Sequence, residues 1–117
     1  MILALLIQYL TTGLDDPNIY VGIEAPSQTT NYVLIDQTGS DTTNHITTTT
    51  VAIQSYGASL LDALTLSDTV KGLMLNFVAE DEVAAVRLET DYNFTNTTTK
   101  QYRWQAVYQI THYLGGF

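Results

Sequence analysis

The chain has 117 residues, of which 45% are hydrophobic and 14% are charged, and its formal net charge is −8. This length predicts a single domain, residues 1–117, with enough apolar side chains for a core. The four basic residues are scattered along the chain, which argues against direct nucleic-acid binding; they are Lys71, Arg87, Lys100 and Arg103. The absence of cysteine excludes disulfides and thiol chemistry.

The N-terminal segment predicts a short helix over residues 2–11. Leu3, Leu6 and Leu10 recur at helical spacing, which gives the segment one apolar face. The apolar run is shorter than the roughly 20 residues that span a bilayer, and it lacks the basic start of a secretory signal. We therefore expect a helix that docks on the core, is stopped by Gly13 and spans no membrane.

Two short strands are predicted next, over residues 19–23 and 32–36. Pro17 and Pro26 supply the turn signals around the first of them. The second is nearly continuous in apolar side chains, which is typical of a strand covered on both faces. Residues 37–44 are glycine, serine, aspartate, threonine, glutamine and asparagine, and they predict a polar loop.

A long strand followed by a long helix forms the organising part of the chain. The strand is predicted over residues 46–56, where Thr49, Val51, Ile53 and Ser55 share one face. Beyond Gly57 apolar residues recur every three or four positions, which predicts a helix over about residues 58–77. Its expected buried stripe contains Ala63, Leu66, Val70, Leu73 and Phe77, and a kink is expected at residues 67–69.

Two further strands complete the predicted domain, over residues 83–92 and 102–111. In the first, Ala84, Val86 and Leu88 are expected to share a face, and residues 93–100 form a polar turn. The order α-β-β-β-α-β-β predicts an α+β fold. We expect a mixed or antiparallel sheet of about five strands, with the first three in a meander and both helices packed on one face.

Residue patterns that carry catalysis or metal binding do not emerge. His45 and His112 lack companions at metal-ligand spacing, and the acidic pairs do not match a calcium-binding loop. A strained nucleophile turn and a glycine-rich phosphate loop are also missing from the sequence. We therefore expect no catalytic residue, metal or cofactor, and a protein that is not an enzyme. Tyr102, Trp104 and Tyr108 are expected to pack in the core or at an interface.

The threonine-rich start of the long strand is the strongest candidate for an interface. Charged residues usually make up about 25% of a soluble domain, so the low charge here favours burial of surface against copies of the chain. A strand that extends past its own sheet would offer its backbone to a neighbour. A solvated hairpin within one subunit is the alternative. The subunit-interface candidates are Ser40, Asp41, Thr42, Thr43, Asn44, His45, Thr47, Thr48, Asn96, Thr97 and Thr98.

Several short stretches of the chain together match the pattern of a known protein family. They are Pro26 with residues 32–35 and 38–39, residues 51–57, Ala58–Ser59 with Asp62–Ala63, and residues 102–110. These stretches resemble the tail terminator (tail completion) proteins of long-tailed bacteriophages, some of which are described as minor capsid or head–tail joining proteins. The resemblance covers nearly the whole chain in short, degenerate pieces. Departures are Gly39–Ser40, where a glycine pair is often seen, and a first proline displaced to Pro17.

The resemblance implies a structural virion protein that forms a hexameric ring on the head-proximal end of the tail tube. Its implied partners are other copies of the chain, the major tail protein and the head connector or stopper proteins, assembled in the host cytoplasm. Double-stranded DNA would pass through the ring without specific binding. The alternatives are another neck or tail-tube component of the same virion, and a small-molecule-binding α+β domain.

Overall fold

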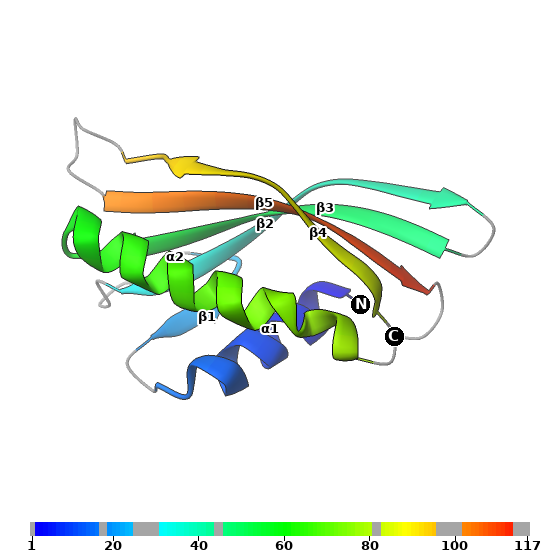
Figure 1. Cartoon of the computed structure of the whole chain (residues 1–117), viewed down its shortest axis with the longest axis horizontal. Helices are drawn as coiled ribbons and strands as arrows, with labels where there is room; N and C mark the ends of the chain where they lie inside the picture. Colours follow the sequence, from blue (N-terminus) through cyan, green and yellow to red (C-terminus); the bar gives the residue numbers. More distant parts are fainter. Residues whose placement is uncertain are drawn as a thin grey trace.

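A computed structural model describes residues 2–16, 19–24, 31–43, 46–80, 83–95 and 102–113. The helices are α1 (Ile2–Leu14), α2 (Leu60–Leu75) and the short 3-10 helix η1 (Phe77–Ala79). The strands are β1 (Tyr20–Gly22), β2 (Tyr32–Thr43), β3 (Ile46–Gly57), β4 (Val83–Asn93) and β5 (Tyr102–Tyr113). They form one five-stranded sheet, and α1 and α2 lie on one face of it (Figure 1). The predicted α+β fold and order of elements are confirmed.

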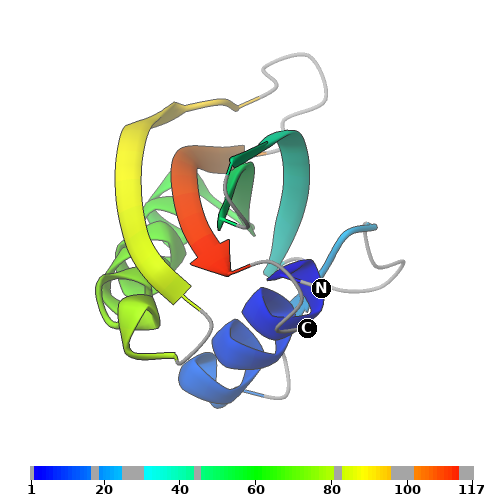
Figure 2. The ribbon, with the colours of Figure 1, turned by 90° about the vertical axis from the view of Figure 1, so that its right-hand side faces the viewer.

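The strands are arranged in the order β1-β2-β3-β5-β4. β1 pairs with β2 in parallel, so the expected meander of the first three strands is wrong. All other neighbours are antiparallel, and β5 lies between β3 and β4. β3 is therefore hydrogen-bonded along both sides, whereas β4 forms one margin of the sheet. Figure 2 shows the sheet curving over the two helices.

The core lies between the sheet and the helices. α2 packs on β3 and β5, while α1 packs on β1, β2 and α2. Alternation in β3 directs Val51 and Ile53 to the same face, as their spacing predicted. Val70 and Met74 of α2 belong to the same buried core cluster. Burial of this apolar surface is the main term that stabilises the fold. The fully buried side chains of the core include Leu6, Leu10, Val33, Ile35, Val51, Ile53, Val70, Met74, Phe77 and Ile110.

The end of α1 differs from the expected stop at Gly13. The helix continues to Leu14, and Asp15 adopts the left-handed conformation with φ of 49°. Aspartate tolerates this conformation better than most residues. Gly13 serves packing instead, because a Cβ there would lie 2.7 Å from Leu73 Cδ2 of α2. The glycine thus lets the two helices approach closely.

α2 is continuous, so the expected kink at residues 67–69 is wrong. Ser59 caps the helix by accepting a hydrogen bond from the Asp62 N–H at 3.1 Å. Ser67 is buried inside the helix rather than interrupting it. The helix then ends at Leu75, before η1. Leu73 of the predicted stripe is half-buried against the core.

Two predicted segments near the margins of the sheet were wrong in detail. Residues 37–43, predicted as a loop, continue β2 and pair with β3 through an irregularity between Gln37 and Gly39. In β4, irregularities after Val83 and Leu88 break the simple alternation that was expected. Val83 is consequently buried and Ala84 exposed. A bulge adds one residue to a strand, and its position could not be predicted from the pattern of hydrophobic residues.

Candidate interface surfaces

The predicted interface segment Ser40–Thr43 forms the end of the β2–β3 hairpin, which extends past both helices (Figure 1). Its four side chains are exposed, and they pair across the hairpin with Ile46–Thr49 of β3. Asn44, His45, Asn96, Thr97 and Thr98 lie outside the described residues. The structure therefore places part of the predicted set on one accessible hairpin.

The expectation that the threonine-rich half of β3 offers a free backbone is wrong. Thr47 and Thr48 pair with β2 on one side and with His112 and Thr111 of β5 on the other. The open backbone belongs to β2 instead. β1 pairs only with Tyr32, Val33 and Leu34, so among the described residues the outer edge of β2 beyond Leu34 has no strand beside it. An unpaired edge of this kind can accept a strand from another chain.

On the helix-facing side of the sheet, β3 and β5 bury polar side chains beside this hairpin. Thr47, Thr49 and His112 are each less than a tenth exposed. Thr49 Oγ1 lies 2.8 Å from His112 Nε2, and Thr42 Oγ1 lies 2.9 Å from Thr47 Oγ1. Burial lowers the pKa of His112 below its ordinary value, because the charged imidazolium is poorly solvated there. Hydroxyl and imidazole contacts thus link β3 to β2 and to β5 in this part of the sheet.

The opposite end of the long axis is formed by the β4–β5 hairpin. Beside Asn93, the Phe94 N–H donates to the Arg103 carbonyl at 3.0 Å, and Arg103 Nε donates to the Phe94 carbonyl at 2.6 Å. The guanidinium also lies 4.3 Å from the centre of the Phe94 ring. Arg103 therefore fixes the described part of the second predicted interface segment, residues 93–100.

The helix-free face of the sheet carries a network that sequence reasoning missed. Tyr32 and Tyr56 stack with ring centres 4.4 Å apart, and Arg103 Nη1 donates to Tyr56 Oη at 3.0 Å. Tyr56 Oη donates to Gln54, whose amide donates to Gln105 at 2.7 Å. The alternation of β3 and β5 placed these polar side chains on one face, but their mutual contacts depend on the register between the strands.

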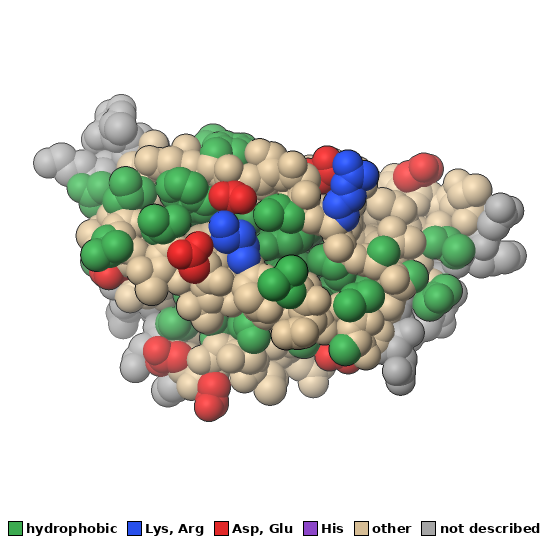
Figure 3. Space-filling view, in the orientation of Figure 1, with side chains coloured by type: hydrophobic (Ala, Val, Ile, Leu, Met, Phe, Trp, Pro, Cys, Tyr) green, Lys and Arg blue, Asp and Glu red, His purple; other side chains and the backbone are tan. Residues whose placement is uncertain are grey.

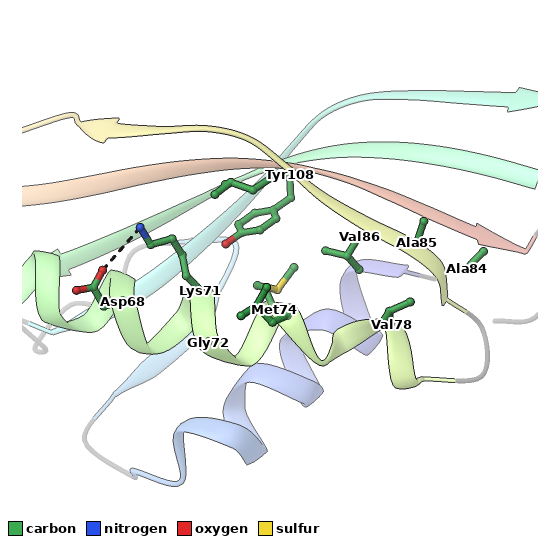
Figure 4. A pocket seen from close by; sticks show the side chains of 11 residues that line it. Asp68, Lys71, Gly72, Met74, Val78, Ala84, Ala85, Val86 and Tyr108 are labelled. Carbon is green, nitrogen blue, oxygen red and sulfur yellow. Dashed lines mark ion pairs between the residues drawn. The ribbon is translucent and has the colours of Figure 1, made fainter.

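An apolar groove runs between α2 and β4, and Figure 3 shows hydrophobic side chains gathered over it. It encloses about 640 Å³, and it was also not anticipated from the sequence. Figure 4 shows Met74, Val78 and Val86 around it. The lining residues are Asp68, Lys71, Gly72, Met74, Leu75, Val78, Ala84, Ala85, Val86, Leu88 and Tyr108.

Charged groups stand at one end of this α2–β4 groove. Lys71 Nζ lies 3.7 Å from Asp68 Oδ1 of α2 and 3.5 Å from Asp91 Oδ1 of β4. Asp91 also accepts a hydrogen bond from Trp104 Nε1 at 3.1 Å. Burial, with the Asp91 carboxylate nearby, raises the pKa of Tyr108 to about 12, so this phenol stays protonated at neutral pH. The groove therefore combines an apolar floor with a compact ion-pair cluster.

Other kinds of site were sought within the described residues. Those residues contain no cluster of three or more histidine, aspartate or glutamate side chains placed to hold a metal ion. In the same ranges, the helices are too short or too polar to cross a membrane. No protein-family model matches the chain, and no curated protein matches it. The surfaces that remain as candidates are the two sheet ends, the β2 edge and the α2–β4 groove.

Proposed function

We propose that this protein is a structural subunit of a bacteriophage virion, a tail terminator that forms a ring at the head-proximal end of the tail tube and joins it to the head connector. The proposal starts from the sequence resemblance to that family. A second support comes from the placement of the two predicted interface segments. Its partners would be copies of itself, the major tail protein and the connector proteins.

The observation that carries the proposal is this placement. The Ser40–Thr43 hairpin and the β4–β5 hairpin at Asn93 lie at opposite ends of a molecule whose longest extent is 44 Å (Figure 1). When one end of a subunit contacts the opposite end of the next, the contact is heterologous. Such contacts close into rings if the rotation between subunits permits. An elongated subunit with different polar surfaces at its two ends suits that geometry.

The edge of β2 supports the same function. Along residues 35–43, alternate residues direct their main-chain groups away from β3, toward the edge beyond the short pairing with β1. A neighbour that added a strand there would gain backbone hydrogen bonds without a large apolar patch. Ring contacts of this type would be weak in isolation and would strengthen on the end of a tail tube that holds the subunits side by side.

The acidity of the chain suits a DNA conduit. Its net charge is −8, and the described cations Lys71, Arg87 and Arg103 all contact carboxylates, ring faces or carbonyl groups. A lumen of this charge repels the phosphate backbone, so DNA would pass without being held.

A substitution on the β2 edge tests the function. Asp41→Lys combined with Thr43→Lys places two cations on exposed positions of that edge, where lysine discourages strand pairing. The subunit should fold, but a phage that depends on it should make tails that fail to stop at the normal length and fail to join heads. The matched control is Gln8→Lys combined with Thr12→Lys, which places two lysines on exposed positions of α1 and should support normal virions.

Two outcomes would count against the proposal. Tails of normal length joined to heads in the double variant would show that the ring uses another surface. Failure of the unaltered protein to bind isolated tail ends would remove the tail-terminator function itself. The neighbouring genes give an independent check, since head–tail joining genes upstream and a major tail protein gene downstream are expected.

A further inference from the structure

α2 carries two apolar stripes, although one sheet can cover only one of them. The first stripe faces the core and contains Ala63, Leu66, Val70 and Met74. The second lies on the other side of the helix and continues into η1. Its members follow alternating steps of three and four residues, which is the heptad spacing of helix–helix seams, and they are Leu61, Leu64, Asp68, Lys71, Leu75 and Val78. We call this set the outer seam.

The outer seam is accessible and apolar at its two ends. Leu75 is 79% exposed, Leu61 is 71% exposed and Val78 is 46% exposed. Among the large hydrophobic side chains that the structure describes, Leu75 and Leu61 have the highest exposed fractions. Apolar residues at regular helical spacing on a solvent-facing surface indicate a packing partner. The helices and strands that the structure describes do not cover them.

The order of residues along the outer seam identifies that partner. If a second copy of α2 lies antiparallel, with its midpoint between Thr69 and Val70, Asp68 of each copy faces Lys71 of the other. The same register sets Leu64 opposite Leu75 and Leu61 opposite Val78, each twice. The side chain of Asp68 is 65% exposed, so it is available for this contact. Both the apolar and the charged positions are therefore self-complementary, which a two-fold interface requires.

We propose that the outer seam of α2 is a two-fold interface between copies of this chain, in which two α2 helices pack antiparallel. The α2–β4 groove runs beside the seam, because Asp68, Lys71, Leu75 and Val78 line it. The partner's Leu61 would enter the end of the groove at Val78, near Val86 and Ala84 (Figure 4). Filling this groove removes exposed apolar surface from water in both copies at once.

Charge explains why the seam has polar residues at its centre. Copies that each carry a net charge of −8 repel one another. Two reciprocal Asp68–Lys71 pairs place opposite charges across the axis, and Asp91 already holds Lys71 from the sheet side at 3.5 Å. A parallel pairing would instead place Asp68 against Asp68 and Lys71 against Lys71. The polar pair thus selects the antiparallel arrangement.

The first experiment measures molar mass by light scattering over a concentration series. The unaltered chain should pass from monomer to dimer. Leu75→Glu should raise the dissociation constant by roughly a hundredfold or more, because each dimer loses two apolar contacts and gains two charges at the seam. The matched control is Ile23→Glu, at a residue that is 61% exposed but outside the seam, and it should leave the dissociation constant unchanged.

The second experiment tests the register, and it uses the absence of cysteine from the sequence. Leu64→Cys and Leu75→Cys are prepared as separate proteins. Under mild oxidation, the mixture should give a disulfide-linked heterodimer, whereas neither variant alone should link efficiently. Thermal unfolding of each variant confirms that the subunit remains folded.

Three results would overturn the inference. They are a monomeric mass for the unaltered chain at every concentration, equal weakening by Ile23→Glu and Leu75→Glu, and disulfides formed as readily in each variant alone as in the mixture. The inference does not rest on the proposed tail function, because it uses α2 rather than the sheet ends. A dimer with no role in tails, or a tail protein with no such dimer, would separate the two.

Discussion

The two halves of β3 have different compositions but the same position in the sheet. The first half, Ile46–Thr50, contains four threonines, and the second contains Val51, Ala52 and Ile53. Both halves pair with β2 and with β5. The apolar half packs beneath α2, while the threonine half buries hydroxyl groups against His112. The comparison teaches that the neighbours of a strand, rather than its polarity, decide whether its backbone is free.

The strongest test of that comparison is Thr48→Pro, in the polar half. Proline cannot donate to the ladder and is poorly tolerated in a strand with partners on both sides. Because Thr48 pairs with Asp41 and Thr111, we expect the variant to be unfolded or insoluble. Circular dichroism and solubility provide the measurement. A folded variant of normal stability would mean that the polar half of β3 is peripheral after all.

The apolar half should show a large but not complete loss of stability on truncation. Ile53 is 1% exposed, so Ile53→Ala should lower the free energy of unfolding by about 2–5 kcal/mol. The exposed Thr38→Ala on β2 is the control and should change it by less than about 0.5 kcal/mol. Urea denaturation measures both. A loss for Ile53→Ala as small as that of the control would place the core elsewhere.

The polar half should depend on one hydroxyl group. Thr49→Val keeps the shape of the side chain but removes the oxygen that lies 2.8 Å from His112 Nε2. Leaving a buried polar atom without that contact costs about 1–3 kcal/mol. Thr49→Ser retains the hydroxyl and should restore much of the loss. If Thr49→Val were as stable as the unaltered chain, the polar contact would not hold the hairpin.

The smallest expected effect is a pH dependence. Burial lowers the pKa of His112 from its ordinary 6.5 in the folded chain, so the unfolded chain takes up the proton first as the pH falls. The free energy of unfolding should therefore be independent of this group above about pH 6.5 and should decrease below it, until the folded pKa is passed. His112→Gln should remove this part of the slope, and His45→Gln should retain it. Equal slopes in all three proteins would contradict the assignment.

Much of the fold could be predicted from periodicity, because helices and strands impose different repeats on apolar residues. The alternation in β3 and β5 and the core stripe of α2 gave the element order and the buried faces. Residues 37–43 failed because glycine, serine, aspartate and threonine predict loops locally, whereas pairing with β3 decided their conformation. The parallel pairing of β1 could not be predicted either, since the apolar pattern of a three-residue strand does not indicate whether it runs parallel or antiparallel to its neighbour.

The candidate surfaces were less predictable than the fold. Ser40–Thr43 was predicted from composition as part of a polar loop at an interface, whereas it continues β2, and the free edge was assigned to β3 rather than to β2. The outer seam of α2 was not predicted, because only one apolar stripe, the buried one, was expected on this helix. Whether Leu61 and Leu75 were buried could not be decided before the position of the helix on the sheet was known.

The place of β5 between β3 and β4 has a consequence for synthesis. Since β5 follows both neighbours in the chain, a ribosome that has completed β3, α2 and β4 has not yet made the strand that joins them. The nascent chain then presents one open edge of β3 and an unsupported β4. Such edges invite pairing with other chains. We expect stable folding to begin only when residues 102–113 have left the exit tunnel, so translation order delays this sheet until its last strand is available.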